Sequence, residues 1–185
     1  MAPFSLLAAT CNLMLLILPA MAMSGGRTGH GLIGYGIVMY YPPCAQACRD
    51  TATSWMLDCP EDPMDSMHMS GMDMGMGTPS PTCLANNDPF LQTIAWCIST
   101  HCKEFDIGTL ERWWQSSITG REDNQPNPKQ SYQESLAKVT TPPEAVVATD
   151  AILNVTSLVD EDSYIATYNG ETNFEAMEIH HATYG

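Results

Sequence analysis

The pattern of hydrophobic and polar positions predicts two consecutive helices in the middle of the chain. Asp88 and Pro89 are residue types that favour the N-cap and the first position of a helix. After them, apolar residues recur at helical spacing, at Leu91, Ile94, Ile98 and Cys102. Thr109 is predicted to cap a second helix, which Gly120 ends. The apolar positions of this helix are Leu110, Trp113, Trp114 and Ile118.

Shorter signals predict further helices on both sides of this pair. Pro42-Pro43 can start a helix but cannot lie inside one, so we expect a helix over 44–53. Ser131 with Glu134 has the spacing of a capping box, and Thr172 with Glu175 repeats that spacing near the C-terminus. Strand-like alternation is scarce. The pattern therefore predicts a mainly α fold.

The N-terminus has the features of a secretory signal peptide. The first 23 residues carry no charge, and a short apolar core is followed by Ala20-Met21-Ala22, a small-x-small cleavage pattern. Cleavage after Ala22 leaves 163 of the 185 residues. An uncleaved signal anchor is the alternative, because the segment lacks a Lys or Arg before its apolar core. Export makes the sequon at Asn154 (Asn-Val-Thr) a candidate N-glycosylation site. We expect the protein in the secretory pathway, outside the cell or on the outer face of the plasma membrane.

Six cysteines remain after this cleavage, and an even number in an exported chain predicts three disulfides. They are Cys44, Cys48, Cys59, Cys83, Cys97 and Cys102. The first two lie four apart, on one face of a helix, and the last two lie at the end of another helix. We expect these two pairs to staple the helices together, in an order that the spacing leaves open. Cys59 and Cys83 would then join each other. A structural zinc site is disfavoured, because the spacing lacks C-x2-C knuckles.

Composition divides the chain into six segments. They are a signal peptide (1–22), a Gly-rich segment with the first Cys-bearing helix (23–59), a Met-rich low-complexity loop (60–82), a central helical pair (83–120), a linker (121–130) and an acidic helical segment (131–185). The overall expectation is a small disulfide-stapled helical domain with a disordered Met-rich loop and flexible termini. The run GHGLIGYG in the second segment matches a dinucleotide-binding fingerprint, which requires a strand before it and a helix after it. No strand precedes this run and Pro42-Pro43 follows it, so we reject dinucleotide binding.

The charge pattern disfavours several classes of function. The net charge is −14, and eight acids with no Lys or Arg follow Lys138. Such a surface repels nucleic acid and anionic lipid and attracts cations. We find no catalytic constellation: Asp160-Glu161-Asp162 reads as a solvated polar loop, and oxidised cysteines provide no thiolate. The adjacent His180 and His181 diverge by about 100° on a helix and chelate one ion poorly.

The Met-rich loop has the spacing of a soft-metal site. Its candidate ligands are Met64, Met67, His68, Met69, Met72, Met74 and Met76. M-x-M and M-x-x-M spacings let two or three thioethers converge on one ion, and neutral thioether sulfur selects Cu(I) over harder metals. The stretch resembles the extracellular Met-rich tails of high-affinity copper transporters. An insert without a ligand role and a hydrophobic contact surface are the alternatives.

Four stretches together resemble the extracellular N-terminal region of fungal ferric reductase-type transmembrane proteins. They are GLIGYGIVMYYPPCAQACRD, PFLQTIAWCISTHC, SYQESLA and FEAMEIHHATYG, and the resemblance covers residues 30–185 without the Met-rich loop. Members of that family reduce Fe(III) or Cu(II) chelates with electrons from NADPH, passed through FAD and two haems on membrane helices. None of those parts is in this sequence. The resemblance therefore implies a domain that serves iron and copper acquisition, is juxtamembrane at its C-terminal end, and is non-catalytic by itself.

A second resemblance is to the CFEM domain, a small extracellular helical module of fungi with eight cysteines. Some CFEM domains bind haem through an aspartate three residues before the fourth cysteine, where this chain has Ser80. Two of the eight cysteines are also missing. The alternative function is thus a secreted CFEM-like metal- or haem-binding module that works without a membrane partner.

Overall fold

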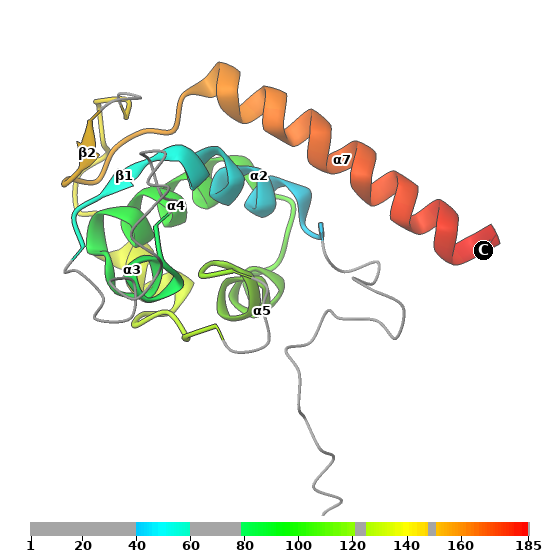
Figure 1. Ribbon diagram of the computed structural model, residues 1–185, viewed down its shortest axis with the longest axis horizontal. Coiled ribbons are helices and arrows are strands. Elements are labelled where there is room, and N and C mark those ends of the chain that lie inside the picture. Colours follow the sequence, from blue (N-terminus) through cyan, green and yellow to red (C-terminus); the bar gives the residue numbers. More distant parts are fainter. Residues whose placement is uncertain (1–39, 60–78, 121–124, 148–150, 185) are drawn as a thin grey trace, which may run out of the picture.

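The computed structural model describes residues 40–59, 79–120, 125–147 and 151–184, and in these ranges the fold is mostly helical (Figure 1). Apart from two short strands and one 3-10 turn, the regular elements are α-helices, as expected from the sequence. In chain order the elements are α2 (Pro43–Thr51), η2 (Ala52–Ser54), β1 (Met56–Leu57), α3 (Pro81–Asn86), α4 (Asp88–His101), α5 (Ile107–Ser117), α6 (Tyr132–Ala137), β2 (Ile152–Leu153) and α7 (Glu161–Tyr184).

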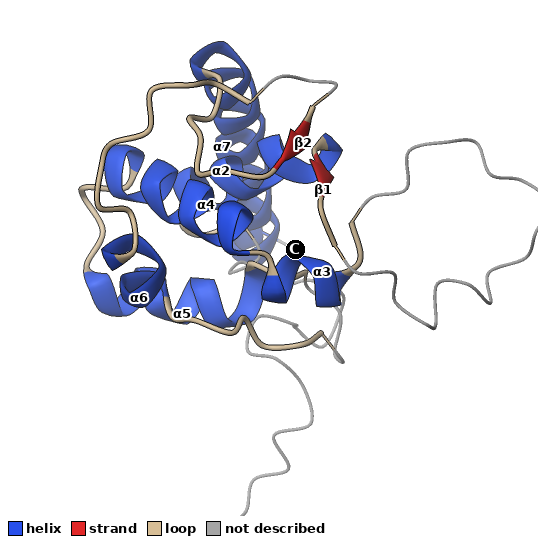
Figure 2. Ribbon diagram, turned by 90° about the vertical axis from the view of Figure 1, so that its left-hand side faces the viewer, coloured by secondary structure: helices blue, strands red, loops and turns tan. Residues whose placement is uncertain are grey.

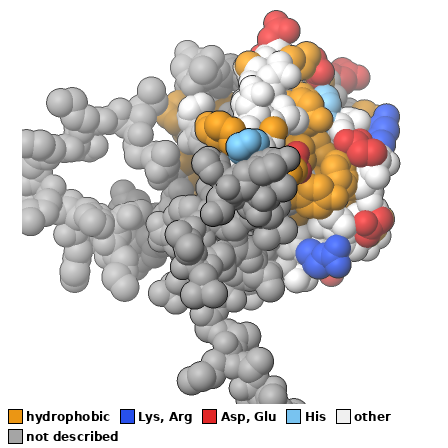
Figure 3. All heavy atoms as spheres, turned by 90° about the vertical axis from the view of Figure 1, so that its right-hand side faces the viewer, with side chains coloured by type: hydrophobic (Ala, Val, Ile, Leu, Met, Phe, Trp, Pro, Cys, Tyr) orange, Lys and Arg blue, Asp and Glu red, His pale blue; other side chains and the backbone are white. Residues whose placement is uncertain are grey.

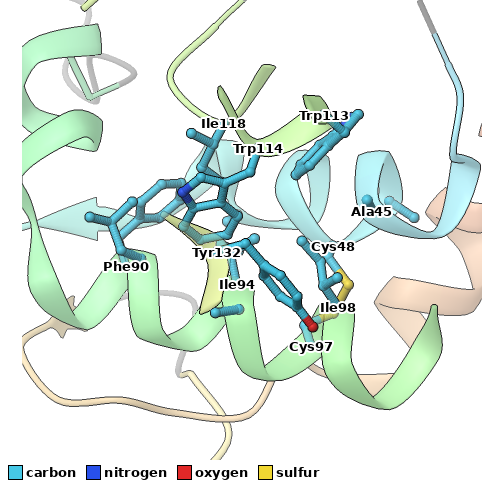
Figure 4. Close-up of a cluster of buried hydrophobic side chains, with 14 of the residues drawn as sticks. Ala45, Cys48, Phe90, Ile94, Cys97, Ile98, Trp113, Trp114, Ile118 and Tyr132 are labelled. Carbon is cyan, nitrogen blue, oxygen red and sulfur yellow. A yellow bond between two sulfur atoms is a disulfide. The ribbon is translucent and has the colours of Figure 1, made fainter. Parts of the chain in front are cut away.

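The core is built around α4, which contributes buried apolar side chains over its whole length. Phe90, Ile94 and Ile98 point toward Trp114 of α5 in Figure 4. The indole of Trp114 is fully buried, and its Nε1 donates to the carbonyl of Gln130 at 2.8 Å. The large aromatic group therefore fills the space between α4 and α5 without leaving a polar atom unsatisfied.

Two disulfides fasten α2 to α4. Cys44 bonds Cys102 and Cys48 bonds Cys97, with Cα–Cα distances of 5.6 and 5.9 Å. The two helices are therefore antiparallel, because the first cysteine of α2 meets Cys102, the C-cap of α4. The small residues Ala45 and Ala47 of α2 are also fully buried. The predicted grouping of these four cysteines is confirmed, and the structure adds their order.

The short helix α6 has an unusually complete N-terminus. Ser131 and Glu134 form the predicted capping box, in which the hydroxyl accepts from the amide of Glu134 and the carboxylate accepts from that of Ser131. Glu111 of α5 supplies the remaining acceptors: its two carboxylate oxygens each lie 3.0 Å from an amide nitrogen, one of Tyr132 and one of Gln133. One side chain of α5 thus fixes both the position and the direction of α6.

The strands form a minimal parallel sheet, with Met56 opposite Ile152 and Leu57 opposite Leu153. Figure 2 shows it at the edge of the helical body. The sheet corrects the expectation of a helical segment over 131–185, because within its described part only α6 and α7 are α-helices. Between α6 and α7 the chain does not form a helix, because it contains Pro142 and Pro143 and because β2 pairs with β1.

The last helix, α7, packs along α2 and runs beyond it (Figure 1). Tyr164, Tyr168 and Glu171 lie at helical spacing, with Tyr164 and Glu171 buried and Tyr168 partly so. Large apolar side chains on α7 are nevertheless exposed, namely Ile165, Phe174, Met177 and Ile179. Figure 3, which views the molecule from the side where α7 ends, shows hydrophobic side chains at the surface beside acidic ones.

Three predicted helix starts were displaced. Asn87, not Asp88, is the N-cap of α4, and its Oδ1 accepts from the amide of Phe90 at 2.9 Å. Asp106, not Thr109, is the N-cap of α5. Thr172 begins no helix, because α7 has already run since Glu161. The predicted ends were close: α2 stops at Thr51, two residues early, and α5 stops at Ser117, three residues before Gly120.

Candidate metal-capture site at the base of the methionine-rich segment

The third disulfide joins the two ends of the Met-rich segment. Cys59, which follows β1, bonds Cys83 in α3, and their Cα atoms lie 5.6 Å apart. This is the pairing expected from the sequence. Residues 60–78 lie outside the described residues, and all seven candidate ligands from Met64 to Met76 are among them. What the structure defines is therefore the base from which the segment leaves the body and to which it returns.

Asn87 organises this base, a role that the sequence did not reveal. Its side-chain oxygen caps α4, while its Nδ2 donates to the carbonyl of Asp58 at 3.1 Å and lies 4.0 Å from the sulfur of Cys59. Asn87 is buried. It thus ties the residue before Cys59 to the start of α4, so the base of the segment is held by the core.

Ser80 starts α3 on the other side of the base. Its hydroxyl accepts from the amide of Cys83 at 3.2 Å, and Pro81 follows as the first helical residue. The predicted boundary of the Met-rich loop at residue 82 thus lies inside α3. Ser80 occupies the place at which the CFEM resemblance calls for a haem-binding aspartate, and its oxygen is already engaged as a cap.

Cysteine chemistry does not compete with the thioethers at this site. All six cysteines that the structure describes are in disulfides. A disulfide sulfur offers neither a thiolate nucleophile nor a thiolate metal ligand. In the same ranges, no three His, Cys, Asp or Glu side chains come together as a ligand set.

The acidic run 160–162 has a structural role at the start of α7. One carboxylate oxygen of Asp160 accepts from both the hydroxyl of Ser163 (2.7 Å) and its amide (2.9 Å). These bonds lower the pKa of Asp160. Glu161 lies 3.6 Å from Nε2 of His101. The run is thus the start of a helix and not the loop expected from the sequence, although its three side chains are exposed, as expected of a solvated face.

A histidine that the sequence gave no reason to single out is partly buried against α7. The ring of His101, at the end of α4, stacks on Tyr164 with centroids 3.8 Å apart. Burial lowers the pKa of His101; Glu161 opposes this shift and Lys103 adds to it. No local pattern predicts a contact between residues 63 positions apart. His180, one of the adjacent histidines, is exposed on α7.

The glycosylation sequon lies at an exposed position after β2. Asn154 is exposed, and Oγ1 of Thr156 donates to Oε1 of Gln92 at 2.6 Å. An exposed acceptor and three disulfides both agree with passage through the secretory pathway. Among the described residues, no helix has both the length and the apolar character needed to cross a bilayer.

Comparisons with known proteins identify no relative. No family model, no curated protein and no solved structure matches this chain.

Proposed function

We propose that the chain is the non-catalytic extracellular module of a ferric/cupric reductase-like protein, and that its Met-rich segment captures Cu(I). The observation that carries the copper part is the Cys59–Cys83 disulfide. It closes the ligand-bearing segment into a loop on a folded, oxidised body. Closure reduces the conformational entropy that the segment loses when several thioethers gather around one ion. The net charge of −14 adds a potential that favours cations.

The four stretches that resemble the reductase family support the rest of the proposal. The part of the first stretch around 43–50 forms α2, and the other three form α4, α6 and the end of α7. Of these elements, α2 packs on α4 and on α7, and α4 packs on α6. The residues of α2, α4 and α6 that carry the resemblance therefore pack into one connected body, whereas Phe174, Met177 and Ile179 of the fourth stretch are exposed. In this proposal Cu(I) is produced elsewhere and delivered to the loop, since the chain itself supplies binding and no electrons.

The copper proposal is tested on the folded, disulfide-bonded protein. We expect it to retain one or two equivalents of Cu(I) against a competing colorimetric chelator. Replacing the six methionines from Met64 to Met76 by Leu should abolish retention, because Leu keeps the volume and removes the sulfur. The matched control is Met56→Leu with Met177→Leu, two methionines of the described body. Equal retention by the six-Leu variant and the wild type would dismiss Cu(I) capture by this segment.

The link to a reductase has a separate test. Sequencing the full transcript shows whether the reading frame continues into apolar helices that carry paired histidines, which the proposal requires. In such a full-length reductase, deletion of 64–76 should lower copper uptake while ferric reduction stays unchanged. Unchanged copper uptake would separate the loop from metal acquisition, and a frame that ends without membrane helices would refute the reductase link.

A further inference from the structure

A cleft of about 590 Å³ opens beside the base of the Met-rich segment. Its walls come from α2 and η2, from α3, from the start of α4 and from the turn after α5. The apolar part of the wall consists of Ala52, Leu84, Phe90 and the two prolines Pro79 and Pro81. A volume of this size, with a wall that is partly apolar and partly polar, suits a small organic molecule that has both kinds of group.

The polar end of the cleft is built around Arg49. Among the described residues that line the cleft, Arg49 is the one cation, and its side chain is 20% exposed. Nη1 of Arg49 donates to Oδ1 of Asp50 at 2.8 Å, and Nε2 of Gln46 donates to Oδ2 at 2.5 Å. Both oxygens of Asp50 are thus engaged by α2 itself. In the described part of the chain, Asp50 is the hydrogen-bond partner of the Arg49 guanidinium, and it accepts from Nη1 alone.

The opposite wall is shaped by the turn that follows α5. Oγ1 of Thr119 donates to the carbonyl of Pro126 at 2.7 Å, which brings the two ends of this turn together. Gly120 has φ +136°, and a Cβ there would meet the side chain of Gln125 at 2.7 Å. Glycine is thus required for Gln125 to lie where it lines the cleft. These contacts hold the described ends of this wall against each other, and residues 121–124 between them lie outside the described residues.

We propose that this cleft binds a small amphipathic monocarboxylate, with its apolar chain against Pro81 and Leu84 and its carboxylate on Arg49. A charge-assisted hydrogen bond from a guanidinium to a carboxylate is stronger than one between neutral groups. Ligands with several negative charges are disfavoured, because Asp50 lies beside Arg49 and the whole chain carries −14. The cleft thus selects one anionic group on an apolar body. This inference does not depend on copper binding.

The probe for this proposal is octanoate, and octanamide serves as its neutral counterpart. Isothermal titration of the folded protein at pH 7 should show saturable one-to-one binding of octanoate and at least tenfold weaker binding of octanamide. Arg49→Gln should remove this preference. Arg112→Gln is the matched control, because Arg112 is an exposed cation of α5 that does not line the cleft. It should leave both affinities unchanged.

A second variant locates the site independently of Arg49. Thr53 is exposed and lines the cleft, so Thr53→Trp should obstruct it and weaken both probes without disturbing the core. Circular dichroism and thermal unfolding confirm that each variant is folded. The proposal is overturned if octanoate does not bind, if octanamide binds equally well, or if folded Arg49→Gln keeps the preference for the carboxylate.

Discussion

Glu111 offers the sharpest test of how this fold is held together, because one carboxylate caps a helix that belongs to another part of the chain. Both of its oxygens accept amide hydrogens from the first turn of α6, at 3.0 Å each. The two amides differ in their surroundings. Tyr132 is 2% exposed, so water has little access to it, whereas Gln133 is exposed. Removal of the carboxylate should therefore destabilise the fold more through the unpaired amide of Tyr132 than through that of Gln133.

The magnitude follows from these surroundings. A buried amide left without an acceptor costs about 1–3 kcal/mol, and an exposed one regains a bond from water. Loss of the negative charge at the N-terminus of α6 adds about 0.3–1 kcal/mol. We therefore expect Glu111→Ala to lower the free energy of unfolding by about 2–3 kcal/mol. Glu111→Gln should lower it by about half as much, because the amide keeps one oxygen acceptor and has no charge.

Urea denaturation at pH 7 with the disulfides intact measures the effect. The midpoint should fall by about 1–2 M for Glu111→Ala, given slopes typical of small proteins. Glu144→Ala, which removes an exposed carboxylate, is the control and should change the midpoint little. Ser131→Ala should couple non-additively with Glu111→Ala, because both side chains cap the same turn. A loss below about 0.5 kcal/mol for Glu111→Ala would show that water replaces the carboxylate and would refute this reasoning.

Three further predictions concern a pH dependence, a backbone position and a cross-link. The pKa of His101 is lowered below 6.5 in the folded state, so the neutral ring stabilises the fold above pH 6.5 and this contribution is lost as the pH falls. The urea midpoint should therefore fall less between pH 7.5 and 5.0 for His101→Phe than for the wild type. Gly120→Ala should cost about 1–3 kcal/mol in the same assay, because it adds backbone strain and a clash with Gln125; an unchanged midpoint would contradict this. Replacing Cys59 and Cys83 by Ser should lower the free energy of unfolding by about 3 kcal/mol, from the loop entropy of a 24-residue separation; no change would mean that the other two disulfides already restrict this loop.

The sequence predicted the parts of the fold that local patterns determine. The apolar spacing around α4, the capping box of α6 and the grouping of the cysteines are all local, and each is confirmed. The order of pairing between α2 and α4 is different, because it depends on whether the helices run parallel or antiparallel. Spacing within each helix carries no information about that direction.

The displaced helix starts have physical causes of their own. Thr172 has the spacing of a capping box, but its Oγ1 donates to the carbonyl of Tyr168 at 3.0 Å, as threonine does inside a helix. The start of α7 depends instead on Asp160 and Ser163. At α5, Asp106 accepts from both the amide and the hydroxyl of Thr109, so the residue expected to be the cap is the partner of the cap.

The candidate site was predictable only where it depends on residue type. The thioether spacing and the Cys59–Cys83 pairing can be read along the chain, whereas the roles of Asn87 and His101 arise from contacts across it. The cleft likewise combines residues from 49 to 125, and no local pattern brings Arg49 next to Phe90 or Gly120.

The three disulfides are nested in the sequence: 59–83 lies within 48–97, which lies within 44–102. A protease that cuts once between Cys59 and Cys83 would release no fragment, since the innermost bridge still joins the two new ends to the body. By the same geometry, insertions or deletions in that stretch change only the smallest ring and leave the two outer bridges in register. Evolution could therefore vary the number of methionines there with little consequence for the helices beneath.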